Sequence, residues 1–148
     1  MDRPQLEDYT FKSMFKEIRL NTSRRTELVD ITGAVQSFLE EAKAKSGTIT
    51  VFIPHTTAGV TINENADPAV PRDILSFTSK LIPEGGAFTH AEGNSDAHIK
   101  SSLFSPSLTL LVEEGRLMLG TWQAVYFAEF DGPRSRKAWL KFISGDAS

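Results

Sequence analysis

The C-terminal part of the chain holds four short, largely apolar segments. Segments of this length and composition are typical of β-strands, and the intervening EEG and DGP sequences are turn signals. A run of strands joined by short turns restricts the fold to one built around a mostly antiparallel sheet. The four segments are SLTLLV at 107–112, RLML at 116–119, WQAVYFAEF at 122–130 and RKAWLKFI at 136–143.

The rest of the chain contains both helical and strand patterns. Apolar residues recur at helical spacing after Asp30 and Thr32, either of which can cap a helix, and again after Asp67. A shorter helix can begin at the capping residue Asn94 or Ser95. Predicted helices therefore cover 32–42, 67–81 and 95–104, and further strands cover 9–20, 48–54 and 60–62. The predicted fold class is α+β, with two main helices and a short third in a single domain over residues 1–148.

Composition excludes several functional classes. The chain has no cysteine, so a metal site would have to use imidazole and oxygen ligands. No apolar run approaches the roughly 18 residues that a membrane span needs, and the N-terminus shows no secretory signal. The net charge of −3 argues against broad electrostatic binding to nucleic acid, although a local basic patch is compatible with it. We expect a cytoplasmic protein that has neither nucleic acid nor membrane as its partner.

The three histidines, His55, His90 and His98, all lie in polar surroundings that interrupt helices and strands. Neutral imidazole is the commonest protein ligand for zinc, and three imidazoles can hold an ion with one position open for chemistry. His90 and His98 are separated by a glycine-containing loop, so the three ligands would have to converge in space rather than along one helix. The alternative is that each histidine only satisfies a local hydrogen bond.

Other candidate residues are polar or charged. Asn63 and Asn65 lie in the segment NENADP, which can bind a cation through oxygen or cap the helix that follows. Glu129 and Asp131 lie two residues apart at a strand end, where they could act as a general base and a cation partner, or pair with nearby arginines. A cationic cluster of Arg134, Arg136 and Lys137 follows, which suits phosphate, or is simply a solvated turn.

Two blocks of the sequence, taken together, resemble the YjbQ family of small cytoplasmic proteins. They are PHTTAGVTINENADPAVPRDI and GNSDAHIKSSLFSPSLTLLVEEGRLMLGTWQAVYFAEFDGPRSRK, and the likeness extends from about Phe11 to Phe142. The resemblance implies a sandwich-like α+β fold that assembles as a homotrimer. It also implies a secondary thiamine-phosphate synthase activity, which joins a pyrimidine diphosphate to a thiazole phosphate and releases pyrophosphate.

The resemblance also implies roles for particular residues. His55 falls in the HTT block, His90 and His98 match the loop histidines, and Glu129 with Arg134 falls in the EFDGPR block. A divalent metal would be expected at the three histidines, most simply zinc, with magnesium or manganese as alternatives. The residues expected to be catalytic are His55, Glu129 and Asp131, and those expected to bind a small phosphorylated metabolite are Asn63, Asn65, Asn94, Arg134 and Arg136.

Two other functions compete with the synthase. The first is a metal-activated hydrolase of a phosphorylated metabolite, in which the histidines lower the pKa of a bound water and Glu129 accepts its proton. The second is a non-catalytic trimeric binding protein with a structural metal. Removal of that metal would lower the melting temperature without any catalytic consequence.

Overall fold

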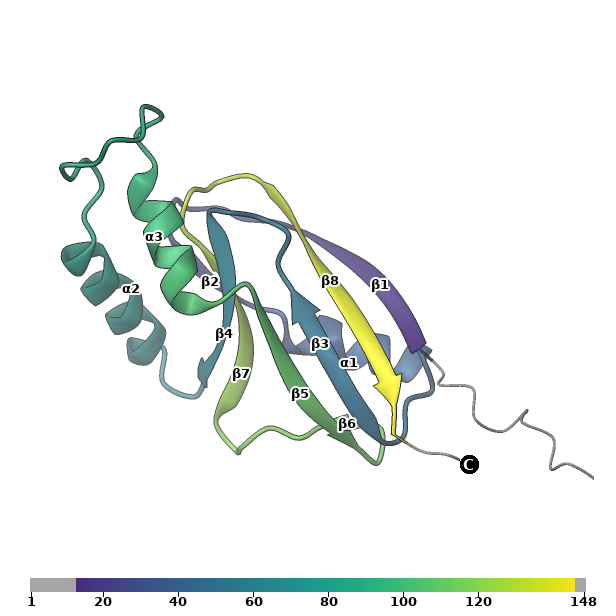
Figure 1. The fold of residues 1–148 in the computed structure, drawn as a ribbon. Coiled ribbons are helices and arrows are strands. Elements are labelled where there is room, and N and C mark those ends of the chain that lie inside the picture. The colour runs from purple at the N-terminus through teal and green to yellow at the C-terminus, as the bar shows by residue number, and fades with distance from the viewer. Residues whose placement is uncertain (1–12, 146–148) are drawn as a thin grey trace, which may run out of the picture.

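A computed structural model describes residues 13–145, and two antiparallel sheets face each other in it (Figure 1). The larger sheet has five strands in the order β1-β8-β3-β5-β6, and the smaller has three in the order β2-β7-β4. The strands are β1 Ser13–Asn21, β2 Glu27–Asp30, β3 Gly47–Phe52, β4 Ala58–Glu64, β5 Ser107–Glu113, β6 Arg116–Leu117, β7 Gln123–Glu129 and β8 Ser135–Ser144. The helices are α1 Thr32–Glu41, α2 Ala69–Leu81 and α3 Ser95–Phe104. The predicted α+β class and its sandwich-like arrangement are confirmed.

The main core lies between the two sheets. Strand alternation points every second side chain inward, so that Ile49 and Val51 of β3 meet Leu140 of β8 and Phe127 of β7 in one buried cluster. Helix α1 adds Phe38 and its neighbours to the same cluster. Each such side chain, fully buried, contributes about 1.5–3 kcal/mol of transfer free energy. This core fixes the register of β8, which carries several of the candidate site residues.

Helices α2 and α3 pack on the outer side of the three-stranded sheet (Figure 1). A second buried cluster forms there around Ala97 of α3 and Ala128 and Phe130, with Leu75 of α2 packed against it. Strand β7 is therefore covered on both faces. No helix in residues 13–145 is both long and apolar enough to cross a bilayer.

The structure differs from the predicted elements at two places that matter for the site. Strand β2, which pairs with β7, was not predicted, because the four residues ELVD show no alternation of apolar and polar side chains. Strand β3 ends at Phe52 rather than at 54, so His55 lies in the connection between β3 and β4 instead of continuing the strand. Pro54 lacks the N–H that a continued strand would use.

The outer face of the five-stranded sheet carries no helix in the part of the chain that the structure describes (Figure 1). Phe15, Phe52, Leu111 and Ile143 point outward from it and are exposed. The rings of Phe52 and Trp139 stack with centroids 5.7 Å apart, across the β3–β8 pairing. This face carries exposed apolar side chains beside the polar Thr50, Thr109 and Lys141, and no helix of residues 13–145 covers it.

Candidate functional site

A cavity of about 410 Å³ opens where β1 ends beside the start of β8. The antiparallel pairing of these strands sets Arg19 opposite Lys137 and Asn21 opposite Ser135, and the β3–β4 connection adds His55. The lining consists of Arg19, Leu20, Asn21, His55, Ser135, Arg136 and Lys137. It contains three cationic side chains and no carboxylate. Its charge suits an anion.

Behind this cavity, Arg136 and Glu129 form a buried ion pair. The Glu129 side chain is fully buried, and that of Arg136 is 3% exposed. Arg136 Nε lies 2.9 Å from Glu129 Oε1, and its Nη2 lies 2.5 Å from Oε2. Thr22 Oγ1 donates to the same carboxylate at 2.7 Å, and Arg136 Nη2 also donates to Thr57 Oγ1 at 2.8 Å. The pair joins β7, β8 and the two loops that carry the threonines.

This environment sets the ionisation of Glu129. Burial raises the pKa of the Glu129 carboxyl, but hydrogen bonds from Arg136 and Thr22 and the charge of Arg136 outweigh burial, so the pKa lies below its ordinary value. The main-chain N–H groups of Phe130 and Asp131 donate to the same carboxylate. Glu129 is therefore an ionised, fully hydrogen-bonded group that holds Arg136 in place.

One guanidinium nitrogen of Arg136 has no hydrogen-bond partner among the described residues. Its Nε and Nη2 are used by Glu129 and Thr57, whereas Nη1 has no hydrogen-bond partner among residues 13–145. Among the described residues, Asn94 Oδ1 is the one buried side-chain polar atom that is both closed off from solvent and unpaired, so the unpaired Nη1 of Arg136 is open to solvent. Since Arg136 lines the cavity, Nη1 is the end of the guanidinium that can reach a ligand there.

His55 is oriented by a main-chain hydrogen bond. The N–H of Lys137 donates to His55 Nε2 at 3.0 Å, so Nε2 must be unprotonated and the neutral ring carries its proton on Nδ1. Burial and the nearby Arg136 charge hold the pKa of His55 below its ordinary value, which favours this neutral form. No partner for Nδ1 is present within the described residues, so its proton is available to a ligand.

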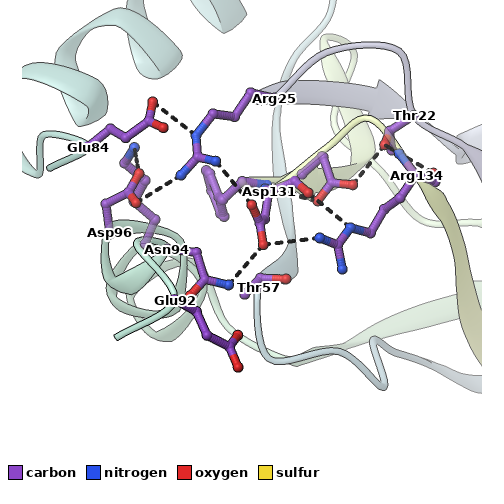
Figure 2. Close-up of polar contacts among 12 residues, drawn as sticks. Thr22, Arg25, Thr57, Glu84, Glu92, Asn94, Asp96, Asp131 and Arg134 are labelled. Carbon is purple, nitrogen blue, oxygen red and sulfur yellow. Dashed lines mark hydrogen bonds and ion pairs between the residues drawn. The ribbon is translucent and has the colours of Figure 1, made fainter. Parts of the chain in front are cut away.

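A second polar network surrounds Arg25 (Figure 2). Its guanidinium contacts three carboxylates from three different segments: Asp131 at 3.0 Å, Asp96 of α3 at 3.0 Å and Glu84 at 3.2 Å. Lys100 Nζ lies 3.1 Å from the other oxygen of Asp96, in a pair that is almost completely buried. Arg25 therefore ties α3 and the loop before it to the corner between β7 and β8.

Asp131 is shared between this network and Arg134. Its Oδ2 accepts a hydrogen bond from Asn94 Nδ2 at 2.9 Å and lies 3.2 Å from Arg134 Nη2 (Figure 2). Asn94 Oδ1 is buried and has no hydrogen-bond partner among the residues described. The structure thus brings together Asn94, Asp131 and Arg134, and leaves the half-exposed guanidinium of Arg134 for a ligand.

His90 and His98 approach each other, with ring centroids 5.3 Å apart. They line a separate cavity of about 330 Å³ together with Phe88 and Ile99, and His90 Nε2 lies 3.6 Å from Glu92 Oε2. His55 lies in the cationic cavity instead. Residues 13–145 contain no group of three histidine or acidic side chains that could hold a metal ion. Within one chain, the three histidines do not come together.

Asn63 and Asn65 lie at the opposite end of β4 from His55. A strand of seven residues spans roughly 20 Å, so these two amides are remote from the cationic cavity. Both residues are exposed, and Asn63 Oδ1 accepts a hydrogen bond from the N–H of Glu64. Asp67, in the same segment, accepts a hydrogen bond from the N–H of Ala69 at the start of α2, which is the capping role considered for this segment.

Several site residues could not be found from the sequence. Arg19 and Asn21 reach the cavity only because β1 pairs with β8, a contact between the two ends of the chain. Arg25 and Thr22 lie in the connection between β1 and an unpredicted strand. The pair of arginines at 24 and 25 was the only available signal, and composition alone does not distinguish it from a solvated turn.

Comparison with known proteins gives consistent relatives. A family model described as "UPF0047 protein YjbQ-like" matches residues 16–145. The UPF0047 protein MJ1081 of Methanocaldococcus jannaschii is 54% identical over 132 residues, covering 89% of this chain and 95% of the relative. The UPF0047 protein YugU of Bacillus subtilis is 48% identical over 131 residues, covering 88% and 99%.

Solved structures agree. A crystal structure of an uncharacterized conserved protein of this family from Clostridium acetobutylicum has a TM-score of 0.85 at 52% identity, covering 86% of this chain and 99% of that one. A YbjQ-like protein of unknown function from Sulfolobus solfataricus has a TM-score of 0.87 at 31% identity, covering 90% and 99%. Sequence motifs, fold and relatives together show that this chain belongs to the YjbQ (UPF0047) family.

Proposed function

We propose that the protein binds a small phosphorylated metabolite in the cationic cavity and acts as a transferase of the secondary thiamine-phosphate synthase type. The observation that carries the proposal is the lining of that cavity, in which Arg19, Arg136 and Lys137 lie around His55 and no carboxylate takes part, although Glu17 and Glu129 pair with these cations from outside the lining. Phosphate groups are recognised by such convergent donors and positive charges.

The chemistry requires stabilisation of a leaving group more than a strong base. In the proposed reaction, a thiazole nitrogen attacks the methylene carbon of a pyrimidine diphosphate, and the carbon–oxygen bond to pyrophosphate breaks. The electron pair of that bond leaves with pyrophosphate, so negative charge develops on its bridging oxygen. Fixed donors aimed at this oxygen lower the barrier because they need no reorganisation during the step. Arg136 and Lys137 are the groups proposed for this role.

Arg134 is proposed to contact the second phosphate-bearing substrate. Its side chain is about half exposed and is held by Asp131, which accepts from its Nε through the main-chain oxygen and from its Nη2 through the carboxylate. Asn94 lies beside the same carboxylate and is proposed to shape this part of the substrate site, since its Nδ2 donates to Asp131 while its Oδ1 is closed off from solvent. Asp131 acts in this scheme by orienting both side chains, while Glu129 acts by holding Arg136.

A divalent metal is a separate part of the proposal. Zinc, or alternatively magnesium or manganese, would be held by His90 and His98, which are the only two histidines of the described chain that contact each other. Two imidazoles do not make a complete site, so the remaining ligands would come from water, substrate or another subunit. A bound metal would supply charge neutralisation to a phosphate.

Homotrimeric assembly and a cytoplasmic location complete the proposal. The uncovered outer face of the five-stranded sheet supports self-association, because exposed Phe15, Phe52 and Leu111 form an apolar surface on it. The hydrolase alternative is less well supported, since it needs Glu129 to accept a proton from a metal-bound water. That carboxylate is instead occupied by Arg136, Thr22 and two main-chain N–H groups.

The test is pyrophosphate release from the pyrimidine diphosphate in the presence of the thiazole phosphate, measured with and without added zinc, magnesium or manganese. Arg134→Ala should raise KM for a phosphorylated substrate by roughly tenfold or more, because a charge-assisted hydrogen bond is lost. Arg72→Ala, on an exposed position of α2, is the matched control and should leave KM unchanged. Absence of release by the parent protein under all metal conditions would overturn the proposal.

A further inference from the structure

The orientation of His55 restricts what this side chain can bind. Its Nε2 already accepts the N–H of Lys137 at 3.0 Å, so the lone pair that a metal would need on that nitrogen is occupied. The other nitrogen, Nδ1, carries a proton in the neutral ring and faces a ligand as a hydrogen-bond donor. A metal could bind there only after that proton was lost or moved to Nε2, and a proton on Nε2 would break the hydrogen bond with Lys137.

The charges around His55 also disfavour a metal ion at this side chain. Arg19, Arg136 and Lys137 line the same cavity, and a divalent cation placed among them would be repelled. Glu129 and Glu17 lie behind or beside these cations, and both are already paired, Glu129 with Arg136 and Glu17 with Arg19 and Lys137. The residues therefore do not fit the expected role of His55 as a metal ligand.

Arg136 supplies the complementary donor. Its side chain is buried, and its Nε and Nη2 are fixed by Glu129 and Thr57, so the position of the free Nη1 is set before any ligand arrives. Pre-positioned donors bind an anion without the cost of ordering a flexible side chain. His55 and Arg136 thus present two fixed N–H donors to one cavity.

We infer that His55 Nδ1–H and Arg136 Nη1–H form a metal-independent oxyanion site that takes the phosphate or diphosphate group of the ligand. This inference rests on the proposed function for the choice of ligand. The site accepts groups whose oxygens act only as acceptors, because both of its donors are held and neither can turn to accept a hydrogen bond. Lys137 and the exposed Arg19 add charge at the entrance.

The first experiment measures the affinity for inorganic pyrophosphate by calorimetry, in EDTA, for the parent protein and two His55 variants. His55→Ala should weaken binding by roughly tenfold or more, because a hydrogen bond to a charged ligand is lost. His55→Asn should stay within about threefold of the parent, because the asparagine amide offers an N–H donor close to the position of Nδ1. Arg72→Ala should bind as the parent does, and melting curves should verify that every variant is folded.

The result that would overturn the inference is pyrophosphate binding that requires a metal, or that responds equally to the Ala and Asn substitutions. Absence of pyrophosphate binding by the folded parent would also overturn it. A second arm uses the pyrimidine diphosphate in place of pyrophosphate, and shows whether the site holds the phosphate of a metabolite or only the free anion. The parent protein and the variants are expected to show the same order of affinity for pyrophosphate and for the pyrimidine diphosphate.

An independent readout is the tautomer of His55, seen in long-range proton–nitrogen NMR spectra of the full chain. The Nδ1–H form is expected, and an Nε2–H form would contradict the inference. Failure of this inference is distinguishable from failure of the proposed function. If pyrophosphate binds and the variants change its affinity as expected, but the protein has no synthase activity, the oxyanion site stands and the proposed function fails. If the protein has synthase activity and His55→Ala leaves KM unchanged, this site takes no part in the reaction.

Discussion

Glu129 and Arg136 lie inside the sandwich, and neither charge can be removed without leaving the other unpaired. A carboxylate beside an arginine cluster suggests a catalytic base and a phosphate clamp from the sequence. In the structure the two side chains pair with each other, which leaves Arg136 a single free nitrogen for a ligand. Burial and hydrogen-bond partners, rather than residue type, decide which atoms of these side chains can act.

Glu129→Gln should destabilise the fold by about 3–5 kcal/mol, because the Arg136 charge would be left buried without a counter-ion. The midpoint of denaturant unfolding measures this loss. Glu40→Gln is the matched control, since Glu40 is exposed on α1, and its effect should stay within about 0.5 kcal/mol. Equal unfolding midpoints for the two variants would show that the buried pair does not contribute.

The lowered pKa of His55 predicts a dependence of stability on pH. The unfolded chain takes up a proton on this ring at its ordinary pKa of 6.5, whereas the folded chain does so only at lower pH. Stability should therefore fall as the pH drops below 6.5 towards the folded pKa, and the slope should decrease in His55→Asn. Unfolding midpoints at several pH values test this. Glu129 contributes in a separate window, because its pKa is lowered from 4.5 and its stabilisation is lost only in more acidic solution.

At the scale of elements, the corner between β7 and β8 sets the geometry of the site. This turn carries Asp131 before and Arg134 after Gly132 and Pro133, and returns the chain so that β8 can pair with both β1 and β3. The connection between β1 and β2 packs against it, and the N–H of Gly132 donates to the main-chain oxygen of Arg25. The corner and this connection therefore hold both polar networks together.

Gly132→Ala should disturb this packing. A Cβ at Gly132 would lie 2.2 Å from the main-chain oxygen of Arg24 and 2.8 Å from Thr22 Oγ1, so the backbone would have to shift at a cost of about 1–3 kcal/mol. Gly33→Ala is the contrasting substitution, because nothing lies within 4 Å of a Cβ there and Gly33 is inside α1. It should stabilise the protein by about 0.5–1 kcal/mol. Thermal unfolding of both variants gives the comparison, and a Gly132→Ala variant as stable as the parent would contradict the described corner.

At the scale of the whole molecule, the described helices cover the outer face of one sheet and leave the outer face of the other sheet open. The outer side of the three-stranded sheet is covered by α2 and α3, whereas the outer side of the five-stranded sheet exposes Phe15, Phe52 and Leu111. The cationic cavity opens next to this uncovered sheet, since Arg19 belongs to its edge strand β1 and Lys137 to the neighbouring strand β8.

Light scattering on the purified protein, coupled to size exclusion, tests the homotrimer. The expected mass is three times that of one chain, and it should persist on dilution if the apolar sheet face is buried between subunits. A monomer across the whole concentration range would contradict the trimer. Addition of EDTA during the same measurement shows whether a metal held by His90 and His98 contributes to assembly.

The sequence by itself determined most of the elements and the α+β class, because hydrophobic periodicity, capping residues and turn signals act over a few residues. The family followed from the resemblance of two sequence blocks. The sequence predicted the third helix with the bounds that the structure has, but missed β2, whose four residues carry no periodic pattern. Only the tertiary structure decided the site. Thr22 and Glu129 are 107 positions apart and Lys137 is 82 positions from His55, and pairing over such distances depends on the packing of the whole core. For the same reason, three histidines that look alike in the sequence fall into two separate cavities.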